Sequence, residues 1–198
     1  MRYSEILTET KAPIIPLSVR QHFLSDEYID YVVENFKFVD HGEYIDHFLE
    51  DFDVDSDDKD AIRALLKKWL PKRLAYIERD LRTNAPSQII RAIRVTPETF
   101  EAMDKAEHLK IGVFFGDGSF EPQNTNPIEI AFTVNNLRGV TIDWGATVAS
   151  RIDYLYGDDE QEYQLVAGSS IPVAEIEAFD GKMERLDLSH WVTKTFSA

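Results

Sequence analysis

The chain has 198 residues, 43% of them hydrophobic and 12% aromatic, and its formal net charge is −15. This composition predicts a folded protein with one compact core, alone or with a small satellite, and argues against global disorder. The absence of cysteine excludes disulfides, thiolate metal sites and a cysteine nucleophile, and the lack of a membrane-length apolar run or a secretory signal predicts a soluble cytoplasmic protein without membrane contact.

The first 84 residues are predicted to form an extended N-terminal arm followed by a helical region. Apolar residues recur at helical spacing in three segments, which begin after Ser25, after Gly42 and at Ile62. Ser25 is a suitable N-cap for the first of these helices. Pro71 is expected to kink or break the third helix, because proline removes a backbone donor and clashes with the preceding turn.

Charge is distributed unevenly over this helical region. Residues 40–60 contain ten acidic residues and one lysine, whereas residues 61–82 contain seven basic and two acidic residues. One interpretation is that these two segments neutralise each other on solvated helix faces, and the other is that the acidic segment is offered to a basic partner. The overall acidity argues against direct binding of nucleic acid.

The second part, residues 85–198, changes in character and is rich in β-branched and aromatic runs. Helices are predicted after Thr96, with Pro97 in the first turn, and over residues 146–156. The order of elements predicts an α+β fold, in which a helical region (1–84) precedes a mixed, mainly antiparallel β domain (85–198) with one or two helices. The predicted strands are 89–95, 109–115, 128–134, 140–144, 162–167 and 173–179.

No metal site is expected from the sequence. Asp53, Asp55 and Asp57 begin like a calcium loop, but the positions where an EF-hand needs glycine and a bidentate glutamate hold Asp58 and Ala64. The five histidines are scattered along the chain. Neither a glycine-rich phosphate loop nor a nucleophile elbow is present.

Arg91 lies inside the apolar, β-branched segment Ile89–Val95, which predicts a buried strand. A guanidinium is costly to desolvate unless an anion meets it. Arg91 is therefore a candidate for binding phosphate or carboxylate. The alternative is that it is a satisfied interior arginine or a strand-edge residue.

Two further motifs follow Arg91 in the chain. The segment Thr141-Ile-Asp-Trp-Gly-Ala-Thr147 leads into a predicted helix, and Glu175-Ile-Glu177 lies in a later strand. This order, over about residues 87–180, resembles the R, S and E motifs of the ADP-ribosyltransferases. In that family an arginine ends the first strand, a strand bearing Ser or Thr leads into a helix, and a Glu-x-Glu or Gln-x-Glu pair closes the site.

The resemblance implies that the protein binds NAD and transfers ADP-ribose to a protein or nucleic-acid acceptor. Glu177 would be the catalytic carboxylate that stabilises the oxocarbenium ion formed on the ribose, and Glu175 would position the acceptor. The helical region would correspond to a cap ahead of the catalytic domain. The residues that the resemblance assigns to the NAD site are Arg91, Thr141, Trp144 and Thr147.

Two other classes of function remain open from the sequence. The protein could be a non-enzymatic acidic binding protein, or a DNA-mimic inhibitor, whose acidic segment binds a basic protein partner through salt-sensitive attraction. It could also be a structural or assembly accessory protein with an apolar interface near Tyr28, Tyr31 and Phe38. In either case Glu175 and Glu177 would simply line a solvated strand face.

Overall fold

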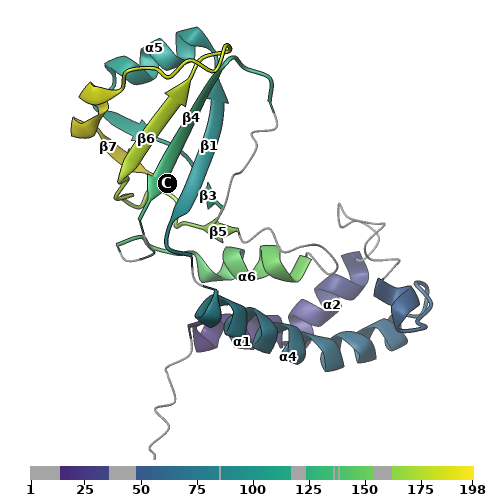
Figure 1. The fold of residues 1–198 in the computed structure, drawn as a ribbon. Helices are drawn as coiled ribbons and strands as arrows, with labels where there is room; N and C mark the ends of the chain where they lie inside the picture. Colours follow the sequence, from purple (N-terminus) through teal and green to yellow (C-terminus); the bar gives the residue numbers. More distant parts are fainter. Residues whose placement is uncertain are drawn as a thin grey trace, which may run out of the picture.

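The computed structural model has an α+β architecture, as predicted, with helices first and then mixed strands with two helices (Figure 1). The main sheet is antiparallel. The residues that it describes are 14–35, 48–84, 86–116, 124–135, 137, 139–153 and 162–198.

The helical region begins with α1 (Leu17–Phe23) and α2 (Asp26–Asn35), followed by the long α4 (Lys59–Thr83). The Ser25 hydroxyl accepts a hydrogen bond from the backbone N–H of Tyr28 (3.1 Å), which confirms the predicted cap of α2. Residues 36–47, which include Phe38 and the predicted start of the second helix after Gly42, lie outside the described residues.

Helix α4 runs without a break through Pro71 over 25 residues, so the predicted break does not occur. Asp58 caps its start by accepting from the backbone N–H of Ala61 (3.0 Å). One stripe of α4 is buried against α2 and α6, which fixes this helix as the centre of the helical region. Its buried apolar residues are Ile62, Leu65, Leu66, Leu70, Leu74, Ile77 and Leu81.

The main sheet consists of β1 (Ile89–Val95), β4 (Ile128–Val134) and β6 (Glu175–Phe179) in the order β1-β4-β6. Both pairs are antiparallel. A further bridge between Ile90 and Gly116 joins β1 to β3 (Phe114–Phe115), and β3 pairs with β5 (Tyr163–Gln164). The strand β1 therefore has β4 on one side and the short β3–β5 pair on the other.

The two faces of the main sheet differ in burial. Because side chains alternate along a strand, residues that are paired across strands share a face. The core face carries Ile89, Ile130 and Phe132, all with no exposed surface. The opposite face carries Thr133 and the exposed Glu175, which are paired in the register. This alternation of faces decides toward which side of the sheet the candidate site residues point.

The remaining elements cover the far end of the sheet in Figure 1. Helix α5 (Pro97–Lys105) starts with Thr96 as its cap, as predicted, since its hydroxyl accepts from the Thr99 N–H (3.2 Å). Strand β2 (His108–Lys110) pairs in parallel with β7 (Thr195–Ser197), and the short helix η2 (Ser189–Thr193) precedes β7. Neither β7 nor η2 is predicted from the sequence.

Several predicted strands are shorter than expected. The segment 109–115 divides into β2 and β3, because Gly112 has a φ of +98° that interrupts an extended chain. The segment 140–144 contributes only a bridge between Ile142 and Leu165, and helix α6 (Trp144–Asp153) begins there. No helix among the described residues has the length and apolar character needed to cross a bilayer.

Candidate functional site

Arg91 extends from the core-facing row of β1, between Ile89 and Ile93 and opposite Phe132. One guanidinium nitrogen, Nη1, donates to the carbonyl oxygen of Phe114 on β3 (3.1 Å). Its Nε is buried and forms no hydrogen bond within the described residues. Burial lowers the pKa of the Arg91 guanidinium, as expected for a cation removed from water.

Gly112 and Phe114 form the walls around this guanidinium. A Cβ atom at Gly112 would lie 3.2 Å from Nη2 of Arg91, so the glycine allows close approach of the cation. The Arg91 Cζ atom lies 6.0 Å from the centroid of the Phe114 ring, which is the outer limit of a cation–π contact. The Phe114 side chain is 42% exposed, and a flat apolar surface therefore adjoins the cation.

Glu162 provides the negative charge near Arg91. This residue directly precedes β5, whose Gln164 and Tyr163 pair with Phe114 and Phe115 of β3. Its carboxylate raises the pKa of Arg91, in opposition to the larger effect of burial. The structure therefore brings together a half-buried cation and a carboxylate from segments 71 positions apart in the chain.

The sequence interpretation missed Glu162, although the chain holds a signal for it. Glu160-Gln161-Glu162 is itself a Glu-x-Glu pair, and its last residue is the first residue of the predicted strand 162–167. Glu160 and Gln161 lie outside the described residues.

Glu175 and Glu177 do not share a cleft with Arg91, which corrects the predicted site. They pair with Thr133 and Ala131 of β4, whereas Arg91 pairs with Phe132, so the glutamates lie on the opposite face of the sheet. Both glutamates are exposed, and Glu177 Oε1 lies 3.1 Å from Nη2 of Arg185. This position is the solvated strand face that the sequence left as the alternative.

The predicted hydroxyl groups are also apart from Arg91. Thr147 has no exposed surface, and its Oγ1 accepts from the Gln164 N–H (3.0 Å) and donates to the Gln164 carbonyl (3.4 Å). Thr147 therefore joins α6 to β5. Thr141 is exposed, and its backbone carbonyl accepts from the Val166 N–H (2.8 Å), whereas Trp144 packs against the core at the start of α6. Both residues therefore lie on the side of β5 away from β3.

A buried arginine on α6, Arg151, contacts β5. Arg151 is 2% exposed, and its Nη1 lies 3.1 Å from Oδ2 of Asp80 on α4. Its guanidinium also lies 5.1 Å from the ring centroid of Tyr163, the residue after Glu162. In addition, Arg73 donates through Nη2 to the Arg151 carbonyl (2.6 Å). The helical region therefore positions the strand that carries the carboxylate near Arg91.

Ion pairs join the basic first half of α4 to the acidic residues of α2 and to one residue of the predicted acidic segment. Among the described residues, the partner from the acidic segment 40–60 is Asp60. Asp53, Asp55 and Asp58 form no ion pair within the described part of the chain. The ion pairs are Asp26–Lys67 (2.7 Å), Asp30–Arg63 (2.8 Å), Glu34–Lys59 (2.6 Å) and Asp60–Arg63 (2.9 Å).

Over the described ranges, no cluster of three or more histidine or acidic side chains could hold a metal ion. Comparisons with protein-family models, with curated proteins and with solved structures find no match to this chain.

Proposed function

We propose that the protein is an ADP-ribosyltransferase-like enzyme whose NAD site is built around Arg91 and Glu162. The observation that carries this proposal is the pairing of β3 with β5, which brings the segment that begins at Glu162 beside Phe114, the residue whose carbonyl accepts from Arg91. The Glu160-Gln161-Glu162 sequence also fits the Glu-x-Glu pattern of the resemblance better than a pair on the far face of the sheet does. In this assignment Glu162 takes the role first given to Glu177.

The surroundings of Arg91 support binding of an anionic, planar substrate such as NAD. Its buried Nε has no hydrogen-bond partner within the described residues, so the guanidinium is incompletely satisfied. A guanidinium can bind a phosphate with two parallel N–H donors. The exposed Phe114 ring next to it provides a surface on which an aromatic base can stack.

Glu162 would act on the ribose during the transfer. The bond between the nicotinamide nitrogen and C1′ of the ribose breaks, and nicotinamide leaves with the electron pair. A lone pair of the acceptor forms the new bond to C1′, and the acceptor releases a proton. A carboxylate beside the sugar stabilises the positive charge that develops there. Neither Thr141 nor Thr147 adjoins Arg91, so this assignment gives neither hydroxyl a role at the ribose.

Nicotinamide release from NAD, measured together with NAD binding by calorimetry, tests this proposal. We expect Glu162→Gln to lower kcat by about 100-fold or more, because it removes the charge that stabilises the transition state. Arg91→Lys should mainly raise KM, because lysine lacks the planar pair of donors.

The matched control is Glu177→Gln, which removes the same group from the opposite face of the sheet. It should leave turnover within about twofold of wild type, in line with a surface substitution. A wild-type protein that neither binds NAD nor releases nicotinamide would refute the proposal, and a Glu177→Gln variant as inactive as Glu162→Gln would refute the residue assignment. Thermal melts of each variant separate these results from unfolding.

A second candidate is the acidic binding protein. It is favoured by one observation, namely that α2 neutralises the basic half of α4 and leaves Asp53, Asp55 and Asp58 without an ion pair in the described residues. These exposed carboxylates are available to a basic protein partner. The dependence of such binding on salt is its test.

A further inference from the structure

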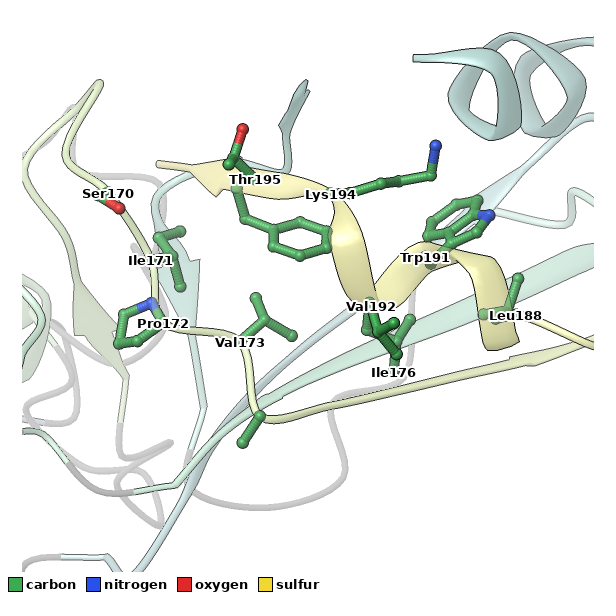
Figure 2. Close-up of a pocket in the computed structure, with 12 residues that line it drawn as sticks. Ser170, Ile171, Pro172, Val173, Ile176, Leu188, Trp191, Val192, Lys194 and Thr195 are labelled. Atoms are coloured by element: carbon green, nitrogen blue, oxygen red, sulfur yellow. The ribbon is translucent and has the colours of Figure 1, made fainter. Parts of the chain in front are cut away.

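A pocket of about 360 Å³ opens between the segments 170–176 and 188–196 (Figure 2). The two segments are tied together on both sides of it. The Ile171 N–H donates to the Phe196 carbonyl (2.9 Å) at one end, and the Leu186 N–H donates to the Ala178 carbonyl (2.8 Å) at the other. These hydrogen bonds fix the backbone on either side of the pocket.

Most of the side chains that line this pocket are apolar, whereas polar atoms make up the larger part of the surface that is exposed in it. Its deeper residues are buried, and its rim includes Val192, whose side chain is 82% exposed. Figure 2 shows Val173, Ile176 and Val192 gathered around the space between the two segments. The volume of this hollow lies in the range of small binding sites. The buried lining residues are Ile171, Leu188, Trp191 and Phe196.

Two of the polar side chains at the pocket, Lys194 and Thr195, are engaged elsewhere, and the third, Ser170, is an uncharged hydroxyl. The Lys194 ammonium donates to the carbonyls of Asp104 (2.7 Å) and Ala106. The Thr195 hydroxyl is hydrogen-bonded to Nδ1 of His108 (2.9 Å). The pocket therefore offers no free charge to a ligand, which favours an uncharged group within it.

The main chain of Ile176 supplies the free polar groups. In an antiparallel ladder, residues alternate between bonding to one neighbour and pointing to the other side. Ala178 accepts from the Leu186 N–H on the outer edge of β6, so Ile176, two residues earlier, also points outward. Its N–H and C=O form no hydrogen bond within the described residues and lie at the edge that lines the pocket.

We propose that this pocket binds one apolar residue of an extended peptide segment from a partner protein. The backbone C=O and N–H of that residue would complete a β-bridge with Ile176, and its side chain would fill the hollow. One residue in extended conformation presents the acceptor and donor pair that Ile176 needs. An apolar molecule without an amide would leave this pair unsatisfied.

The exposed glutamates define the neighbours of that apolar residue. Because side chains alternate along a strand, the residues on either side of it would lie on the opposite face, near Glu175 and Glu177. Glu175 forms no ion pair in the described part of the chain, and Glu177 is paired only with the exposed Arg185. Charge complementarity therefore favours a basic–apolar–basic sequence in the peptide.

The test is a ¹⁵N NMR titration with the acetylated and amidated peptide Gly-Lys-Leu-Lys-Gly. We expect the Ile176 amide resonance to shift and its hydrogen exchange to slow when the peptide binds. A peptide with an N-methyl group on the leucine nitrogen loses the backbone donor, and a peptide with serine in place of leucine loses the apolar side chain. Each should bind about tenfold more weakly or worse.

Protein variants provide the matched comparison. Val192→Glu places a charge at the pocket rim and should abolish binding, whereas Leu17→Glu changes an exposed apolar residue (65% exposed) of the helical region and should not alter it. Equal affinity for the parent and N-methyl peptides would overturn the β-bridge. A binding event that leaves the Ile176 amide unchanged, or the absence of binding, would overturn the site. None of these results depends on NAD.

Discussion

At the scale of single residues, the environment of Arg91 illustrates how a core strand can hold a cation. Its guanidinium is placed between the Phe114 ring and the bare backbone of Gly112, with one donor bonded to a carbonyl. Two opposing influences act on its pKa, because burial lowers it and the Glu162 charge raises it. The residue therefore has the incompletely satisfied character expected of a binding group.

Asp104 gives a pH-dependent prediction at the same scale. Its carboxylate accepts from Nε1 of Trp191 (2.7 Å) and is also bonded to His190, and these two hydrogen bonds lower the pKa of Asp104 from its ordinary value of 3.8. A carboxyl whose pKa is lowered by folding stabilises the native state above its unfolded-state pKa and loses this contribution as the pH falls through its native-state pKa.

We therefore expect Asp104→Asn, which keeps an acceptor oxygen but no charge, to unfold more easily than wild type at about pH 6. The difference should begin to shrink as the pH falls below about 4, because the unfolded state then binds a proton at Asp104, and it should vanish only below the lower native-state pKa. Urea unfolding midpoints measured across this range check it. A difference that is independent of pH would contradict the role assigned to the charge.

At the scale of elements, the contact between α4 and α6 positions strand β5. Arg151 and Asp80 are both buried, and their ion pair joins the two helices directly behind Tyr163. Removing one partner of a buried pair leaves an uncompensated charge, which is more costly than removing both.

Asp80→Asn should accordingly lower the free energy of unfolding by roughly 3 kcal/mol, since the Arg151 cation stays buried. The double variant Asp80→Asn with Arg151→Met should recover part of this loss. The exposed pair of Lys105 and Glu101 is the control, and its removal should cost less than about 1 kcal/mol. Urea unfolding of the wild type, the single variant, the double variant and the control measures these changes. A double variant with a lower free energy of unfolding than Asp80→Asn would contradict the explanation.

At the scale of the whole molecule, the net charge of −15 is not evenly compensated. The carboxylates of α2 form ion pairs with the basic half of α4, so the charges of these two helices largely neutralise each other. The acidic turn before α4 remains as a surface of negative charge. Such a surface attracts basic partners over a distance of about the Debye length, roughly 10 Å at 0.1 M salt.

If this surface is functional, binding of a lysine-rich peptide should weaken steeply between about 50 and 300 mM NaCl. Changing Asp53, Asp55 and Asp58 to Asn keeps the turn and cap hydrogen bonds but should lower affinity and flatten the salt dependence. Changing Glu101, Glu107 and Glu184 to Gln removes the same charge elsewhere and should have little effect. Fluorescence anisotropy measures the affinity of both triple variants. Equal losses of affinity would show that binding depends on the net charge alone and not on this surface.

Much of the fold followed from the sequence because the deciding signals are local. Helical periodicity and capping residues such as Ser25 and Thr96 act within one or two turns, and the apolar run around Arg91 defines its own strand. The order of helices before strands was enough to predict an α+β protein.

Only the tertiary structure decided which acid faces the arginine and where the pocket lies. Glu162 and Glu177 belong to similar Glu-x-Glu patterns, and what separates them is strand register, in which a shift of one residue moves a side chain to the other face. That register depends on pairing between segments far apart in the chain, as does the parallel contact of β2 with β7 beside the pocket. Local pattern fixes the elements, and non-local pairing fixes which of their faces meet.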